Sequence, residues 1–213
     1  MIMAAKPGTY GTNQPYKMSF TSGGLYLNES VELSESYLKT KDWDKTISLA
    51  QAEGLTSLPK EKSKRRMLRE IVNRLETLCD DELQFLVEDE DRQEQSLLIW
   101  ISVCRAYRLV REFALEVVQD RYLSFQLELP LESFDLLFEQ KAEWDDALAS
   151  SSAATRVRLR QVVFKIMREA GIISEDHRIQ STYLSTSLRA LIEANTPSDL
   201  AVFPGVMAEG GKQ

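Results

Sequence analysis

The chain has 213 residues, of which 43% are apolar and 28% are charged, a composition that suits one or two compact globular domains. Its formal net charge of −7 excludes a uniformly basic coat of the histone or ribosomal-protein kind, because an acidic surface repels phosphate on average. Any nucleic-acid site must therefore be local.

Cysteine usage and hydropathy predict a cytoplasmic protein. The two cysteines, Cys79 and Cys104, stand in apolar helical surroundings, which is typical of free thiols in a reducing compartment. The N-terminus lacks the charged and apolar pattern of a secretion signal. The most apolar run, residues 97–104, is far shorter than the roughly 20 residues that cross a bilayer. We expect no membrane partner.

Helical periodicity dominates the chain between two ends rich in proline and glycine, residues 1–17 and 195–213, which we expect to be flexible tails. Apolar residues recur with a period of about 3.6, which predicts helices over residues 29–38, 42–53, 59–78, 81–87, 92–104, 107–120, 131–145, 155–170 and 186–194. Gly54 and Gly171 suit positions just after a helix, and Pro130 suits a first turn.

Strand signals are sparse, and the clearest one covers residues 171–180, where we expect a short β-hairpin. The fold class we predict is mainly α, with two helical, helix-turn-helix-like units. The first unit covers residues 18–105 and the second covers residues 106–194. The second resembles a winged helix, because two helices, a linker of small residues, a basic helix and a hairpin follow one another in that order.

Positive charge is concentrated in two segments. Residues 60–69 and 156–168 together hold eleven basic residues and one acidic residue, out of 26 and 33 in the chain. The remainder keeps 15 bases and 32 acids, a formal charge of −17. The candidate nucleic-acid-binding residues are Lys60, Lys62, Lys64, Arg65, Arg66 and Arg69 in the first segment, Arg156, Arg158, Arg160, Lys165 and Arg168 in the second, and Arg178 on the predicted wing.

The second basic segment is amphipathic, with an apolar stripe that includes Leu159, Val163 and Met167. In a winged helix, the N-terminal part of such a helix enters the major groove, so Arg156 and Arg160 would face the bases. The alternative is that these side chains only pair with the carboxylates of residues 132–146, as basic faces of helices often do.

Chemistry for catalysis is not apparent in the sequence. The single histidine, His177, has no cysteine or second histidine at metal-ligand spacing. Glycine patterns for phosphate loops and the Gly-x-Ser-x-Gly elbow are missing. Acidic runs such as residues 88–91 are more typical of helix caps than of magnesium sites. We therefore expect no enzymatic activity, no cofactor, no metal and no small-molecule substrate.

Four stretches resemble the BrxA family, whose members are small accessory proteins of bacteriophage-exclusion (BREX) defence clusters. These are YKMSFTSGGLYLNES (16–30), SKRRMLREIVNRLETLCDDEL (63–83), REFALEVVQDRY (111–122) and TRVRLRQVVFKIMREAGII (155–173). The resemblance implies a helical, cytoplasmic, non-catalytic protein that works beside other components of the defence system and is associated with DNA binding. It transfers no active-site residue, and it does not extend to the C-terminal tail beyond Thr196.

Together, these features predict an accessory protein of phage defence that binds double-stranded DNA through phosphate contacts from both basic helices. Two alternatives stay open. One is a protein–protein adaptor whose basic helices dock on acidic surfaces of other defence proteins. The other is an RNA-binding factor, since some members of the family have been likened to a helical antitermination factor.

Overall fold

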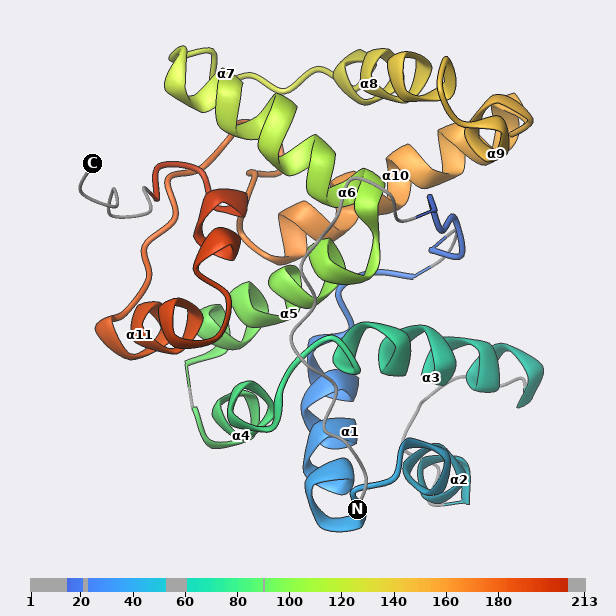
Figure 1. The fold of residues 1–213 in the computed structure, drawn as a ribbon, viewed down its shortest axis with the longest axis vertical. Helices are drawn as coiled ribbons and strands as arrows, with labels where there is room; N and C mark the ends of the chain where they lie inside the picture. The colour runs from blue at the N-terminus through green and yellow to red at the C-terminus, as the bar shows by residue number, and fades with distance from the viewer. Residues whose placement is uncertain (1–14, 21–22, 53–60, 90, 207–213) are drawn as a thin grey trace.

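A computed structural model describes residues 15–20, 23–52, 61–89 and 91–206, and almost all of its regular structure is helical (Figure 1). The elements are α1 (Leu27–Thr40), α2 (Trp43–Ala52), α3 (Glu61–Leu75), α4 (Asp80–Glu88), α5 (Arg92–Ala106), α6 (Arg108–Glu112), η1 (Phe113–Val118), α7 (Gln119–Leu123), α8 (Glu132–Ala142), α9 (Asp146–Ala149), α10 (Ala153–Glu169), α11 (Thr186–Asn195) and η2 (Pro197–Val202). The predicted mainly α class is confirmed.

Helix α5 runs through the middle of the molecule and contacts α1, α3, α4, α6, α10 and η2 (Figure 1). All of its residues from Glu94 to Ala106 are buried, which explains why the sequence has its most apolar run here: a helix without a polar face belongs in a core. Trp100 is fully buried, and its indole nitrogen donates a hydrogen bond to the carbonyl of Val202 at 3.2 Å. The buried apolar residues form one continuous cluster around this helix.

A buried ion-pair network fixes α5 to its neighbours. The guanidinium of Arg105 donates to both carboxylate oxygens of Glu82 at 2.7 Å, to Asp199 at 2.7 Å and to the carbonyl of Thr77 at 2.9 Å. All three charged side chains are at most 3% exposed. Arg111 also pairs with Asp199. The network therefore joins α4, α5, α6 and η2 inside the core.

Residues 108–123 form one long helical stretch, α6, η1 and α7, where the sequence predicts a helix over residues 107–120. The middle section, η1, has π-helical hydrogen bonding, which inserts one extra residue into a helix turn. Phe113 lies in this section and packs against Phe134 of α8 and Phe164 of α10, with ring centroids 5.4 and 6.0 Å apart. This aromatic contact holds α8 and α10 together.

Helix α10 is capped at both ends, and the glycine cap at its C-terminal end is the one that the sequence predicts. The hydroxyl of Ser152 accepts from the backbone N–H of Thr155 at 3.1 Å, as an N-cap does. At the other end, Gly171 has a φ of +73°, and the N–H of Ile172 donates to the carbonyl of Met167 at 2.9 Å. This is the Schellman arrangement for which glycine is preferred.

The hairpin predicted over residues 171–180 is reduced to isolated bridges, one between Ile173 and Ile179 and one between Glu128 and Arg178. The described residues contain no sheet. The chain reverses between residues 174 and 178, and His177 takes a φ of +59° in this turn. The helix-turn-helix and winged-helix units therefore remain a prediction, as does the division into two domains at residue 105.

The expected C-terminal tail begins later than residue 195. Residues 197–202 form the 3-10 helix η2, and Asp199, Leu200 and Phe203 are buried. Apolar residues at irregular spacing hold this segment against α5 and α11. At the other end, Tyr16 and Phe20 are also buried. Residues 1–14 and 207–213 lie outside the described part of the chain. None of the helices described is long and apolar enough to cross a membrane.

Candidate nucleic-acid interface

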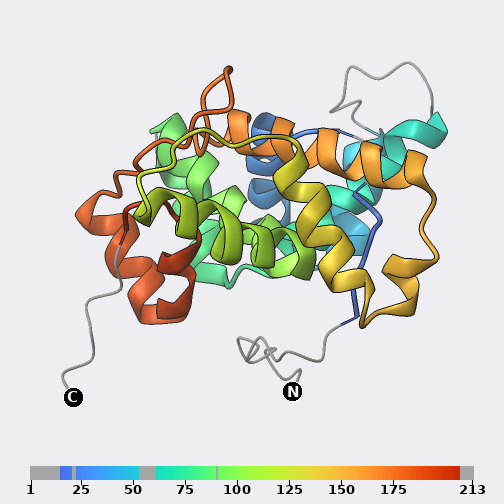
Figure 2. The ribbon, with the colours of Figure 1, turned by 90° about the horizontal axis from the view of Figure 1, so that it is seen from above.

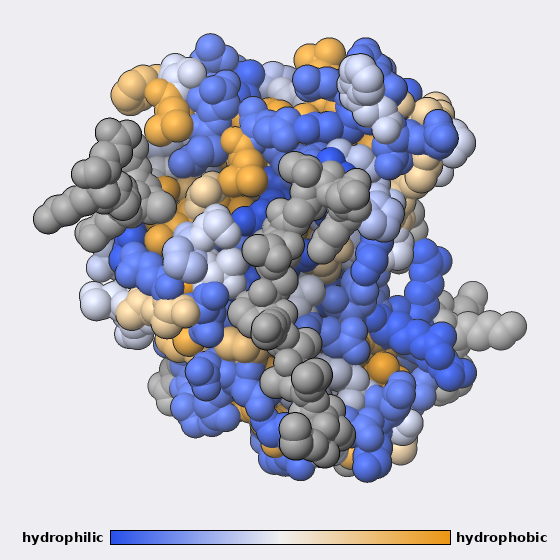
Figure 3. Space-filling model, viewed as in Figure 1, coloured by the Kyte–Doolittle hydropathy of each residue, from blue (hydrophilic) through white to orange (hydrophobic). Residues whose placement is uncertain are grey.

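The first basic segment forms the N-terminal half of α3, and its arginines face outward. Arg65, Arg66 and Arg69 are exposed and line an open pocket of about 470 Å³ together with Ser19, Glu70 and Asn73. Figure 3 shows hydrophilic side chains gathered over α3 at the right of the view, with the surface hollowed above them. Arg65 and Arg69 have no carboxylate partner within the described ranges. This surface is open to a phosphate.

The lysines of this segment are placed differently. Lys64 is only 5% exposed, and its ammonium donates to the carbonyl of Gln51 at 3.4 Å. It therefore packs α3 against α2 and does not face solvent. Lys60 lies outside the described residues, and the side chain of Lys62 is likewise not described.

A network of polar groups lies behind the arginine pocket. Tyr107 donates to the carboxylate of Glu70, and Arg74 donates to the same carboxylate at 3.0 and 3.2 Å. Burial and the nearby Glu70 raise the pKa of Tyr107 to about 12, so the phenol stays protonated near neutral pH. Arg74 is itself buried and offsets the charge of Glu70. The pocket is consequently cationic at its rim.

Residues 15–20 hold one wall of the pocket in place. Tyr16 donates to Glu112 at 2.7 Å and lies under the guanidinium of Arg108, 4.4 Å from its ring centroid. The hydroxyl of Ser151, just before α10, contacts the sulfur of Met18 at 3.1 Å. Figures 1 and 2 show this segment running between α3 and the N-terminal end of α10, which lie on the same side of the molecule.

The second basic segment, α10, is paired with the chain's own carboxylates. Arg156 contacts Glu139 at 2.6 Å, and Arg160 pairs with Asp135, both on α8. Arg156 also lies over the ring of Phe138, 5.5 Å from its centroid. This is the pairing within the chain that the sequence offers as the alternative to groove binding by this helix.

The remaining predicted residues have similar neighbours. Lys165 lies 3.7 Å from Glu169, Arg168 lies 3.3 Å from Glu175, and Arg178 lies 3.7 Å from Glu128. Arg168 also contacts His177 at 3.2 Å. Arg158 is exposed on the outer face of α10. Because these pairs are partly exposed, each contributes little to stability, about 0–1 kcal/mol, and a phosphate can compete for the cation.

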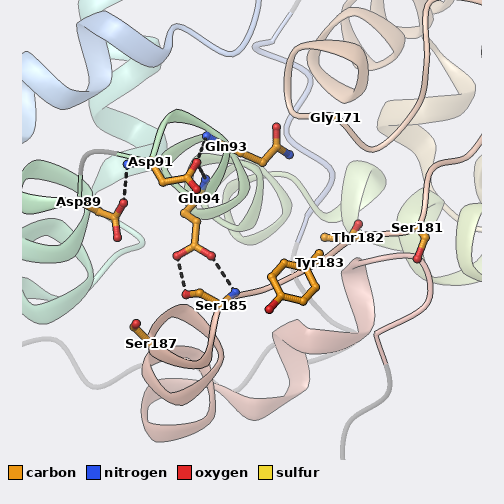
Figure 4. A pocket seen from close by; sticks show the side chains of 10 residues that line it. All are labelled: Asp89, Asp91, Gln93, Glu94, Gly171, Ser181, Thr182, Tyr183, Ser185 and Ser187. Carbon is orange, nitrogen blue, oxygen red and sulfur yellow. Dashed lines mark hydrogen bonds between the residues drawn. The ribbon is translucent and has the colours of Figure 1, made fainter.

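A second hollow, of about 500 Å³, lies between the start of α5 and the start of α11 (Figure 4). Its wall carries Asp89, Asp91 and Glu94 and no basic residue. Figure 4 shows the Glu94 carboxylate directed at Ser185, whose N–H and hydroxyl both donate to it at 2.7 Å. The charge of this hollow has the wrong sign for a phosphate, so it adds nothing to the interface.

Sequence reasoning found the arginines but missed Ser19 and Asn73. Asn73 follows Arg69 by four residues, so a helical wheel of α3 places both on one side. Ser19 carries no comparable signal, because it comes from an irregular segment 46 or more residues before the arginines in the chain.

Comparison with known proteins agrees with the fold. The family model BrxA matches residues 14–196. The chain belongs to the BrxA family. Similar curated proteins include the BREX protein BrxA of Bacillus cereus (strain H3081.97), 26% identical over 75% of this chain and 80% of that protein. The BREX protein BrxA of Paramagnetospirillum magneticum (strain ATCC 700264 / AMB-1) is 25% identical over 84% of this chain and 91% of its own length.

A third family member, the BREX protein BrxA of Escherichia coli O9:H4 (strain HS), is 24% identical over 84% of each chain. Among solved structures, the crystal structure of an uncharacterized protein from Magnetospirillum magneticum superposes with a TM-score of 0.74 and 23% identity. The match covers 91% of this chain and all of that one. This chain therefore shares its helical fold with that protein.

Proposed function

We propose that this chain is a non-catalytic component of a BREX phage-defence system that binds double-stranded DNA, with α3 as the primary contact. Membership in a family whose curated relatives are named BREX proteins supports the defence role. The observation that carries the DNA proposal is the exposed arginine row of α3, where Arg65 and Arg69 have no carboxylate partner among the described residues.

Helix α10 is a secondary contact in this proposal. The N-terminal end of α10 lies on the same side of the molecule as α3 (Figures 1 and 2), but a phosphate must first displace Asp135 and Glu139 from its arginines. Since most contacts are to phosphate, binding is weakly selective for sequence and decreases steeply with salt. When the logarithm of the binding constant is plotted against the logarithm of the salt concentration, each phosphate contact contributes about −0.9 to the slope.

The test is fluorescence anisotropy of a labelled duplex at several salt concentrations. We expect Arg65→Glu/Arg69→Glu to abolish binding and Arg156→Glu/Arg160→Glu to weaken it less. A matched control is Arg121→Glu/Arg189→Glu, which makes the same change in net charge on α7 and α11, away from α3 (Figure 1). Circular dichroism checks that each variant is folded.

Two results would contradict the proposal. If the wild type binds no duplex even at low salt, the DNA function is refuted and the adaptor alternative gains. That alternative is supported by one observation: the arginines of α10 already bind carboxylates, those of α8. If the control variant weakens binding as much as the α3 variant does, the effect is one of net charge and α3 is not the site. Competition by duplex and single-stranded RNA tests the RNA alternative.

A further inference from the structure

The α3 pocket offers more than a row of cations along a duplex backbone. Arg65, Arg69 and Asn73 follow one another at intervals of four residues, so they form a stripe whose members are about 6 Å apart along the helix. The first two are exposed, the third is half-buried, and all three line the pocket. The pocket therefore changes from cationic at one end to neutral and polar at the other.

The neutral end has hydrogen-bonding capacity to spare. Among the described residues, the amide nitrogen of Asn73 donates one hydrogen bond, to the Tyr107 hydroxyl at 3.2 Å. No hydrogen bond within the described part of the chain uses its carbonyl oxygen. Asn73 thus presents one N–H and one carbonyl oxygen. Ser19 contacts the same Tyr107 hydroxyl as Asn73, at 3.4 Å, and its hydroxyl also lies 3.4 Å from Glu70; both are long contacts.

A phosphodiester backbone would use the cationic end alone. A nucleotide uses both ends, because its phosphate and its base differ in charge and lie a few ångströms apart. A side-chain amide that offers a donor and an acceptor matches the N6 and N7 edge of adenine. A terminal 5′-phosphate carries more charge than an internal one, since its second ionisation lies near pH 6. The volume of about 470 Å³ falls within the range of small-molecule sites.

We propose that this pocket binds a nucleoside 5′-phosphate, with the phosphate at Arg65 and Arg69 and an adenine edge at Asn73. The ligand is either the 5′ end of a DNA strand or a free mononucleotide. This inference rests on the proposed function, because both use the same two arginines, but it adds a preference for ends and for adenine that phosphate contacts to a duplex do not have.

The test is competition against a short single strand that carries a 3′ fluorophore, a 5′-phosphate and a 5′-terminal adenine. Unlabelled competitors are the same strand with a 5′-hydroxyl, the strand with a terminal thymine, and free dAMP. We expect loss of the phosphate, and separately exchange of adenine for thymine, to weaken competition about tenfold each, as for the loss of one good polar contact. Competition by dAMP would identify a free mononucleotide as a ligand, whereas competition by strands alone would identify the strand end.

Variants separate the two ends of the pocket. Asn73→Leu, of similar size, should remove the preference for adenine and keep the preference for the phosphate. Asn73→Asp keeps the shape of the side chain and should weaken all phosphorylated competitors by repulsion. Arg65→Ala/Arg69→Ala should remove the phosphate preference. Circular dichroism controls for folding, since Asn73 also contacts Tyr107.

The inference is overturned if strands with and without the 5′-phosphate compete within about twofold, or if Asn73→Leu leaves the adenine preference intact. Either result, with duplex binding still lost in Arg65→Glu/Arg69→Glu, leaves the proposed function standing. Conversely, end binding without any duplex binding would refute the duplex function and keep the pocket.

Discussion

Replacing Arg105 by methionine tests the buried network that joins α4, α5 and η2. The substitution keeps the approximate length of the side chain but removes the guanidinium, and with it the hydrogen bonds to Glu82, Asp199 and Thr77. Glu82 and Asp199, 1% and 0% exposed, are then left with excess negative charge inside the core. Breaking a buried ion pair in this way costs about 3–5 kcal/mol, because one charge is left uncompensated.

That loss is a large part of the 5–15 kcal/mol that is typical of a folded domain. For a chain of 213 residues, it corresponds to a fall in melting temperature of roughly 6–20 °C. Urea unfolding followed by circular dichroism measures the loss. The matched control is Lys39→Met, which removes an exposed pair with Glu35 at 2.7 Å and should cost less than about 0.5 kcal/mol.

A deficit below about 1 kcal/mol would refute the reasoning that the charges inside this network carry the energy.

Three further predictions concern single residues. Gly171→Ala should lower the free energy of unfolding in urea by about 1–2 kcal/mol. The residue takes a φ of +73°, and a Cβ would lie 2.7 Å from the side-chain nitrogen of Gln93. An unchanged urea midpoint would contradict this. Burial and Glu70 raise the pKa of Tyr107 to about 12, above the value near 10 in the unfolded chain. The contribution of the protonated phenol to the stability of the fold is therefore complete below pH 10 and is lost as the pH rises through 12. Between pH 10 and pH 12, the free energy of unfolding should therefore fall less steeply in Tyr107→Phe than in the wild type. The same dependence on pH in both proteins would argue against this pKa. Burial raises the pKa of the Cys104 thiol, so a disulfide reagent should modify it only as the chain unfolds, and rapid modification in buffer would refute its burial.

Much of the fold could be predicted because the helices are long and periodic. Helix α5 starts at Arg92 because Asp91 caps it. Helix α10 ends before Gly171 because a glycine follows its last turn. The short elements gave no such signal. Helix α9 has four residues, and η2 is a 3-10 helix whose buried residues do not follow the 3.6 period. Proline and glycine near η2 were therefore interpreted as a tail.

The site was predictable only in its charged part. A helical wheel places Arg65 and Arg69 on one face of α3, and an amphipathic helix exposes that face. The wheel does not show which segment lies beside a helix. Ser19 enters the pocket because Tyr16 and Phe20, on either side of it, are buried in the core. This is a tertiary contact without a local pattern.

The contrast between the two basic helices follows from their neighbours and not from their own sequences. Arg65 and Arg69 on α3 have the same spacing as Arg156 and Arg160 on α10. Beside α10, however, α8 presents two carboxylates at that same spacing of four residues, one for each arginine. Beside α3, residues 15–20 bring a serine to the pocket.

Displacing the two α8 carboxylates costs about 0–1 kcal/mol each, which together corresponds to a loss of affinity of at most about 30-fold. A phosphate meets no such cost at α3. The same number of arginines therefore yields a stronger contact on α3, and a duplex that reaches both helices should occupy α3 first and α10 only at low salt, where each additional phosphate contact contributes most.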